Sequence, residues 1–174
     1  MLDILNKALP GAVLGSTDRF GIPEFLVDAA RWVEVIRALK EDRTSSMEML
    51  VDLVSVDYSE YPDHAGGRYG LIAHLKSLAR GGRVSLKCLL PEDAPAVNTL
   101  TVLYKNANFL EREAFDQMGI RFIGHPNLKR LLNHHEFVGH PLRKDYPIKK
   151  RQWLSANESL MDEMDARLRE KGWV

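Results

Sequence analysis

Residues 68–91 read RYGLIAHLKSLARGGRVSLKCLLP and contain two apolar, β-rich runs with a glycine pair between them. The runs RYGLIAHLKSLA and RVSLKCLLP are both typical of strands. Gly81 and Gly82 can supply the positive φ angles that a tight hairpin requires. The stretch therefore predicts two strands joined by a short turn, which places a β-sheet in the fold.

Further elements are predicted on both sides of this hairpin from the period of the apolar residues and from glycine and proline. They are a helix over residues 2–9, two short strands within residues 12–28 around a turn at residues 19–21, a helix over residues 29–41 capped by Asp28, and a polar C-terminal helix over residues 156–172 with Leu160, Met164 and Leu168 on one stripe.

Residues 48–61, EMLVDLVSVDYSEY, form a mostly apolar run. Strict alternation places Leu50 on one face with Asp52, and Val51 on the other face with Leu53. A run this apolar is expected in a central strand.

Residues 98–119, NTLTVLYKNANFLEREAFDQMG, have apolar side chains at helical intervals. Asn98 or Thr99 can cap the start of a helix, and Gly119 is a plausible residue just beyond its end. We expect one helix here, or two with a break near Asn106.

The order of elements predicts an α+β fold, in which helices cover one face of a mixed sheet of four or five strands. This α+β domain is expected over residues 1–123, followed by an extended basic docking loop and a C-terminal helix within residues 124–174. Residues 124–155 show little periodicity over about thirty residues, more than the ~12–15 usual for a structureless loop. This loop is therefore expected either to be functional or to stay disordered until it binds a partner and buries apolar surface against it.

Composition limits the class of protein. The 24 basic and 24 acidic side chains give a net charge of zero, so the whole molecule has no bulk attraction for nucleic acid or anionic lipid. Its single cysteine, Cys88, excludes an internal disulfide and fits a reducing compartment. The apolar stretches are too short to cross a bilayer, so membrane association is expected through partners only.

Four of the six histidines lie between His125 and His140, and two of them stand in Gly-His-Pro units. A zinc or iron site is the more specific of two hypotheses for these histidines. However, His134 and His135 are adjacent and lack the i, i+3 or i, i+4 spacing of helical ligands. Glycine permits unusual backbone angles and proline stiffens the residue before it. Each imidazole is therefore expected to tie the loop to nearby backbone, and no metal ligand is predicted.

Glu111, Glu113 and Asp116 could suggest acid-base chemistry. On a helix, however, the two glutamates point in different directions, while Arg112 and Asp116 stand at i, i+4 and can pair. No candidate nucleophile lies nearby, so an ion-pair network that anchors the following loop is the preferred interpretation and no catalytic residue is predicted.

Between His125 and Arg151 the chain has seven basic side chains against only Glu136 and Asp145. This local excess first suggests nucleic acid, but no aromatic RNA-binding pair, helix-turn-helix or finger motif accompanies it. An acidic protein partner is favoured, because prolines stiffen the segment and reduce the entropy lost on docking. Cofactor and nucleophile motifs such as GxGxxG, a Walker loop, CxxC and GxSxG are also absent.

The run NFLEREAFDQMGIRFIGHPNLKRLL, followed by GHPLRKDYPI, resembles the signature of the thirty-kilodalton subunit family of respiratory complex I, known as its C subunit. The resemblance extends over roughly residues 47–149 and includes MLVDLVSVDYSEYP, which is similar to the family's first central strand. The positions that match, and that it implies form a partner interface, are Glu111, Arg112, Glu113, Asp116, Gly119, His125, Pro126, Leu128, Arg130, Gly139, His140, Pro141, Leu142, Arg143, Lys144, Asp145 and Pro147. Gln117 and Met118 depart from the family pattern, which usually has an apolar residue and often Phe there.

This resemblance implies an accessory subunit of the hydrophilic arm of NADH:quinone oxidoreductase, with no cofactor on this chain. The assembled complex would carry iron–sulfur clusters, FMN, NADH and quinone, and couple electron transfer to proton translocation. The partners implied are the quinone-site (D) subunit and the iron–sulfur (B) subunit, on the cytoplasmic side of the bacterial inner membrane or an equivalent organelle membrane. Arg143 and Lys144 are expected to pair with carboxylates of the partner.

Three alternatives remain open from the sequence. The chain could be the equivalent subunit of a membrane-bound hydrogenase or of a quinone-reducing complex with another electron donor. It could be a free-standing histidine-metal enzyme, which would carry stoichiometric metal. It could be a nucleic-acid-binding module, whose affinity would fall steeply with salt.

Overall fold

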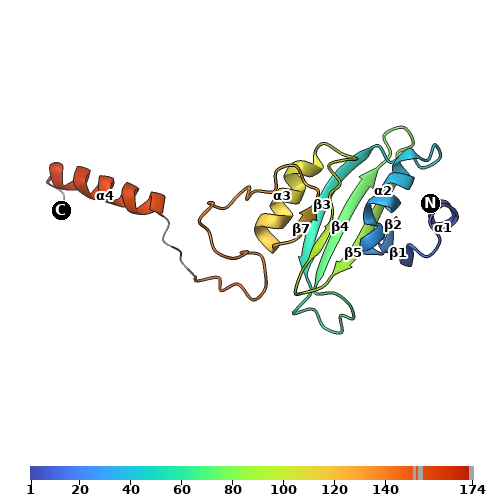
Figure 1. The fold of residues 1–174 in the computed structure, drawn as a ribbon, viewed down its shortest axis with the longest axis horizontal. Helices are drawn as coiled ribbons and strands as arrows, with labels where there is room; N and C mark the ends of the chain where they lie inside the picture. Colours follow the sequence, from blue (N-terminus) through green and yellow to red (C-terminus); the bar gives the residue numbers. More distant parts are fainter. Residues whose placement is uncertain (151, 153–154, 173–174) are drawn as a thin grey trace.

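The computed structural model describes residues 1–150, 152 and 155–172 of the chain. The elements are α1 (Leu2–Ala8), β1 (Val13–Arg19), β2 (Ile22–Val27), a 3₁₀ turn η1 (Ala29–Arg31), α2 (Trp32–Glu41), β3 (Met49–Asp57), β4 (Tyr69–Lys76), β5 (Arg83–Leu90), β6 (Ala96–Asn98), α3 (Ala107–Met118), β7 (Arg121–Ile123) and α4 (Ser155–Glu170). Figure 1 shows these elements along the chain.

The main sheet has five strands in the order β1-β2-β5-β4-β3. The predicted hairpin is confirmed, because β4 and β5 pair antiparallel from Tyr69↔Leu90 to Lys76↔Arg83. Its connection is longer than the tight turn predicted, since residues 77–82 lie between the strands, and Gly81 has positive φ (72°) whereas Gly82 does not. β1 and β2 form a second hairpin, whose two-residue turn at Phe20 and Gly21 has positive φ at both positions. Since β2 pairs parallel with β5, the sheet is mixed, as predicted.

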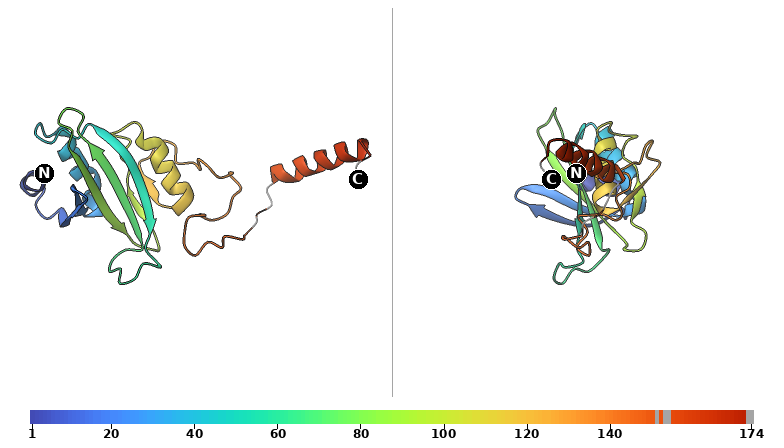
Figure 2. Two further views of the ribbon diagram at one scale, coloured as in Figure 1. Left: turned by 180° about the vertical axis from the view of Figure 1, so that it is seen from behind. Right: turned by 90° about the vertical axis from the view of Figure 1, so that its left-hand side faces the viewer.

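Helices α2 and α3 lie on the same face of this sheet, which Figure 2 shows from behind. The hydrophobic core lies between these two helices and the sheet. Alternate residues of β4 are buried, namely Tyr69, Leu71, Ala73 and Leu75, and they belong to the same core cluster as the buried stripe of α2, namely Trp32, Val35, Ile36 and Leu39. The predicted α+β fold with helices on one sheet face is therefore confirmed.

The prediction that residues 48–61 form a central strand is wrong, because β3 is the outermost strand and pairs only with β4. The predicted alternation fails as well. The register shifts between Leu50 and Asp52, so Val51 is an extra residue and Leu50 turns to the buried face with Leu53. A bulge depends on the partner strand, which the sequence of β3 alone does not reveal.

The helix predicted over residues 98–119 starts later than expected. Asn98 belongs to β6, which pairs parallel with β7, and Thr99 N–H donates to Ile123 O at 3.0 Å. α3 begins at Ala107, directly after Asn106, where a break was expected. It ends at Gly119 in the left-handed conformation with φ 76°, as predicted. Residues 96–98 instead form β6, which pairs with β7 in a second, two-stranded sheet.

The C-terminal helix is present as α4, and Figure 1 shows it standing apart from the sheet. Leu160 and Met164, on its predicted apolar stripe, are more than half exposed. Within the described residues, none of the helices combines the length and hydrophobicity that crossing a membrane demands.

Candidate docking site

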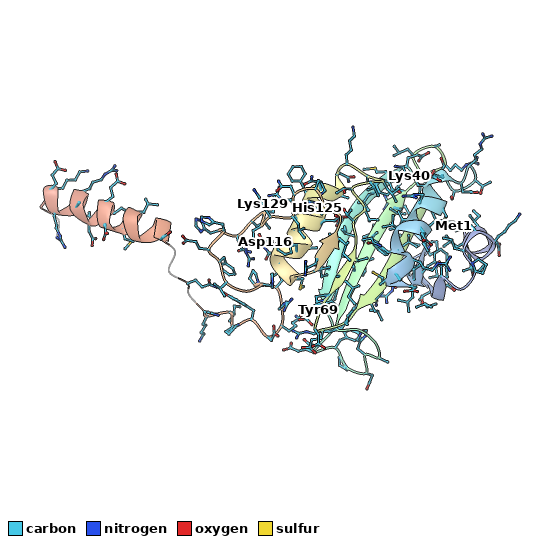
Figure 3. All side chains as sticks on the ribbon, in the orientation of Figure 1. Met1, Lys40, Tyr69, Asp116, His125 and Lys129 are labelled. Atoms are coloured by element: carbon cyan, nitrogen blue, oxygen red, sulfur yellow. The ribbon has the colours of Figure 1, made fainter. Side chains whose placement is uncertain are left out.

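Two polar clusters fasten residues 125–146, here called the arm loop, to the sheet domain. The first surrounds Asp116 at the end of α3, and the second surrounds Asp57 at the end of β3. Figure 3 shows Asp116, His125 and Lys129 around α3, with Tyr69 near the end of the sheet where the arm loop passes.

The Asp116 side chain is fully buried and is enclosed by donors from the arm loop. Its Oδ2 accepts the backbone N–H groups of Leu131, Leu132 and Asn133 at 2.8–3.0 Å. Its Oδ1 accepts from Arg130 Nη1 at 2.7 Å and from Asn133 Nδ2 at 3.1 Å. Burial alone would raise the pKa of Asp116, but the hydrogen bonds from Asn133 and Arg130 outweigh it and lower the pKa to about 2.

The predicted pair between Arg112 and Asp116 is wrong, although the predicted anchoring of the loop is correct. Arg112 donates to the backbone carbonyls of Lys129 at 3.0 Å and Arg130 at 3.1 Å. Arg130 takes the place beside Asp116 and also reaches Gly139 O at 2.9 Å through Nη2. A side chain fourteen residues away thus replaces the i, i+4 neighbour.

The second Gly-His-Pro unit packs on the end of α3. His140 Nδ1 lies 3.0 Å from Asp116 O, and burial lowers the pKa of His140, which favours a neutral ring that donates from Nδ1. Arg143 Nε donates to Met118 O at 2.8 Å. A Cβ at Gly119 would stand 2.6 Å from His140 Nε2 and closer still to Arg143 Nη2. Only glycine fits this position.

The first Gly-His-Pro unit holds the opposite end of the arm loop. His125 Nδ1 accepts Asn127 N–H at 3.0 Å, so Nε2 carries the proton and donates to Asn108 O at 3.2 Å. The histidine of each Gly-His-Pro unit therefore ties the loop to backbone, as predicted. Glu111 Oε2 lies 4.0 Å from His125 Nε2, and both side chains are fully buried.

Glu111 forms no part of the predicted ion-pair network around Asp116. Its carboxyl accepts Leu100 N–H at 2.5 Å and the Thr99 hydroxyl at 2.5 Å, which joins α3 to the segment after β6. Burial raises the pKa of Glu111 to about 7, although the hydrogen bonds from Thr99 and Leu100 act in the other direction.

The second cluster centres on Asp57 and Arg68, which sequence reasoning missed. Arg68 Nε and Nη2 bind both oxygens of Asp57, at 3.1 and 2.9 Å. Arg68 also pairs with Asp145 at 3.0 Å, and Asp57 accepts Lys144 N–H at 3.0 Å. Burial opposes ionisation of Asp57, yet Arg68 and Lys144 N–H hold its pKa well below its ordinary value. The only sequence signal was a carboxylate at the end of an apolar run.

Arg143 takes part in an aromatic contact inside the chain. The guanidinium carbons of Arg68 and Arg143 each lie 5.1 Å from the centre of the buried Tyr69 ring. Together with its hydrogen bond to Met118, this contact makes Arg143 a positioning residue of the arm loop. Lys144, next to it, is bound through its backbone while its side chain is exposed.

The structure divides the predicted interface residues into three groups. Glu111, Asp116 and Gly119 are buried within the domain. Those that are half-buried as whole residues, although the His125 side chain itself is buried, and that fasten or line the loop are Arg112, His125, Leu128, Arg130, Gly139, His140, Pro141 and Arg143. Those left exposed are Glu113, Pro126, Leu142, Lys144, Asp145 and Pro147. Gln117 and Met118, the departures from the family pattern, are also buried, and Gln117 O accepts Leu142 N–H.

The exposed surface of residues 125–150 combines apolar and basic side chains. Four large apolar residues are at least 56% exposed, namely Leu132, Val138, Leu142 and Ile148. Exposed Lys144 lies among them in the sequence, and exposed Lys149 and Lys150 directly follow Ile148. In the part of the chain that the structure describes, no group of three His, Cys, Asp or Glu side chains is arranged to hold a metal ion. Apolar side chains with a polar rim are typical of protein interfaces.

Comparisons with known proteins place the chain in a family. The family model for the 30 kDa subunit of respiratory-chain NADH dehydrogenase matches residues 25–152. The C subunit of NADH-quinone oxidoreductase from Ralstonia pickettii (strain 12J) is 40% identical over 147 residues, which are 83% of this chain and 74% of the relative. The C subunit from Burkholderia cenocepacia (strain HI2424) matches with the same identity and coverage.

Two solved structures share the fold. A trypsin-resistant fragment (1-134) of Nqo5 is 32% identical with a TM-score of 0.65, covering 73% of this chain and 98% of the fragment. A chain of a membrane-bound sulfane sulfur reductase, an archaeal respiratory membrane complex, has a TM-score of 0.69, covering 85% of this chain and 84% of that one. At 24% identity it shows the fold alone and does not favour the alternative of another complex. The chain belongs to the family of the 30 kDa subunit of respiratory-chain NADH dehydrogenase, which is the C subunit of NADH-quinone oxidoreductase.

Proposed function

We propose that this subunit of NADH-quinone oxidoreductase acts by docking, and that residues 124–174, here called the arm, bind the quinone-site (D) subunit close to the iron–sulfur (B) subunit. The chain is a subunit of the hydrophilic arm of complex I, in keeping with its family membership. Its own contribution is binding energy and placement. The iron–sulfur clusters, FMN, NADH and quinone belong to other subunits, and electron transfer to quinone is coupled to proton translocation in the assembled complex.

One observation carries this proposal. The inward-facing side chains of the arm loop bind the domain. Arg130, His140 and Arg143 all contact backbone carbonyls at the end of α3. Its outward-facing groups are apolar and basic, among them Leu142 and Lys144. A loop fixed in this way loses little conformational entropy when it docks on a partner. Its exposed basic side chains favour a partner with an acidic surface.

The same geometry supports a division of the chain. Residues 1–123 form the α+β domain, and residues 124–174 form the arm with α4. The trypsin-resistant fragment of the relative, which covers 73% of this chain, is consistent with a domain that is stable without the whole arm. The subunit would lie on the cytoplasmic side of the bacterial inner membrane, held there by its partners.

Replacing Lys144 by Glu in a tagged copy of the subunit tests the docking proposal. Lys144 has an exposed side chain, so the isolated subunit should keep its thermal unfolding midpoint. Purification from gently solubilised membranes should recover the quinone-site and iron–sulfur subunits, with NADH:quinone activity, at least about threefold less than with the wild type, because a contact between opposite charges becomes repulsive.

Lys7→Glu is the matched control, because Lys7 is exposed on α1. It should recover the partners as the wild type does. Equal recovery with Lys144→Glu and Lys7→Glu would remove Lys144 from the interface. Recovery of the wild-type chain without any other part of the complex would overturn the docking proposal as a whole.

A further inference from the structure

The outer edge of β3 has unused hydrogen-bonding groups. Tyr58 N–H donates to Arg68 O at 2.8 Å, so Tyr58 faces β4. Because an antiparallel strand alternates, Val56 and Val54 also bond to β4, while Leu53, Ser55 and Asp57 turn their backbone groups outward. Among the described residues, none donates to or accepts from the outward backbone of Ser55.

The outer edge of β3 borders an open space and is not covered by packed side chains. A space of about 170 Å³ is lined by Leu53, Val54 and Ser55 of β3, by Glu113 and Gln117 of α3, and by Leu142. A second, separate space of about 310 Å³ is lined by Val56 and Asp57 of β3, by Tyr58, Glu60 and Tyr61 just beyond the strand, and by Lys144. The two hollows therefore follow the strand along its second half.

The first half of the same edge is closed. The Leu53 N–H is taken by Asp52 Oδ1 at 2.8 Å, and Leu50 O accepts from Asn106 Nδ2 at 2.8 Å. The bulge at Val51 adds a further irregularity. Charges, bulges and side-chain caps of this kind protect sheet edges from pairing. From residue 54 to residue 56 the sequence Val-Ser-Val has no charge and no proline, and it suits a strand.

We propose that the edge of β3 from Leu53 to Asp57 receives an extended segment of another subunit, which adds to the sheet as a sixth strand. The free N–H and C=O groups recognise an extended backbone, and the neighbouring charges set its direction. Asp52 and Glu113 border the first hollow and have no ion-pair partner in the described part of the chain, whereas Glu60 and Lys144, of opposite charge, both line the second. The segment should therefore carry a basic residue near Asp52.

This second interface rests on the proposed function only in taking its partner to be a subunit of the same complex. Hydrogen exchange, read at single amides by mass spectrometry in the isolated subunit and in the purified complex, tests it directly. The Ser55 and Asp57 amides should exchange at least about tenfold more slowly in the complex, because they become bonded. The Val54 and Val56 amides, already bonded to β4, serve as internal controls.

Exchange at Ser55 and Asp57 that stays fast inside an active complex would overturn the added strand and leave the docking proposal standing. Failure of the subunit to enter any complex would instead overturn the docking proposal. The two ideas are therefore separated by one set of samples.

A pair of proline variants gives a second test. Ser55→Pro removes an outward N–H from an edge strand, where proline is tolerated, and the adjoining hollow can receive its ring. Ser16→Pro is the matched control on the opposite edge, since Ser16 faces outward on β1 by the register from the Phe20 and Gly21 turn.

Both proline variants should keep the far-ultraviolet circular dichroism of the wild-type subunit, and only Ser55→Pro should reduce recovery in the complex, by at least about threefold. Equal recovery of both folded variants would overturn the proposal. If Ser55→Pro does not fold, the exchange measurement on the wild type decides the question alone.

Discussion

Asp116 at the end of α3 and Arg130 in the arm loop lie fourteen residues apart in the sequence, and Arg130 Nη1 stands 2.7 Å from Asp116 Oδ1. The carboxylate is fully buried and the Arg130 side chain is 18% exposed. Three consecutive N–H groups of the loop converge on the other oxygen. This single acid therefore organises a loop that has no regular secondary structure of its own.

Asp116→Asn should destabilise the subunit by about 3 kcal/mol at pH 7, because it removes one charge of a buried pair and leaves Arg130 uncompensated. Urea unfolding measures this change, and Asp3→Asn on the exposed side of α1 is the control. The folded pKa of Asp116, about 2, is below the usual 3.8, so its stabilisation is present above pH 3.8 and is lost as the pH falls toward 2. A variant whose deficit stayed constant down to pH 2 would contradict this origin.

Glu111→Gln should change how stability depends on pH. The folded pKa of Glu111, about 7, is above the usual 4.5, so the favourable contribution is fully present below pH 4.5 and is lost as the pH rises through about 7. The wild type should lose about 2 to 3 kcal/mol relative to Glu111→Gln across this window. Urea unfolding at half-unit steps of pH measures the difference, and parallel curves for the two proteins would refute the assignment.

Gly119→Ala should be more costly than the backbone conformation alone explains. Gly11 has a φ of 74° with open space around it, whereas Gly119 has a φ of 76° with His140 Nε2 2.6 Å from the place of a Cβ. We expect about 1 kcal/mol for Gly11→Ala and about 3 kcal/mol for Gly119→Ala, because only the second adds a steric clash. Thermal and urea unfolding of both variants give the comparison, and equal losses would show that the His140 contact relaxes freely.

Arg143→Ala should destabilise the isolated subunit by about 2 kcal/mol, since it removes the cation–π contact with Tyr69 and leaves Met118 O without its donor. Lys144→Ala, the neighbouring control, should change the free energy of unfolding by less than about 0.5 kcal/mol. Urea unfolding compares the two variants. If Arg143→Ala proved as stable as Lys144→Ala, Arg143 would serve the partner alone and not the fold.

Local chemistry determined much of this fold from the sequence alone. Gly81 indicated the reversal between β4 and β5, and Gly119 indicated the end of α3, because both positions have the positive φ that glycine adopts readily. The helical spacing of the apolar residues predicted α2, and the Gly-His-Pro units predicted histidines that bind backbone groups. Each of these signals involves residues close together in the chain. The resemblance to the thirty-kilodalton subunit family, also visible in the sequence, led to the function.

Only the tertiary structure decided which distant groups meet. It placed β3 at the edge of the sheet, gave Asp116 the partner Arg130 in preference to Arg112, and brought Arg68 and Arg143 to the ring of Tyr69. An i, i+4 rule ranks neighbours on one helix, but a buried carboxylate is stabilised by whichever donors the whole fold brings to it. Strand order likewise depends on how several elements pack together, and no single strand carries that information in its own sequence.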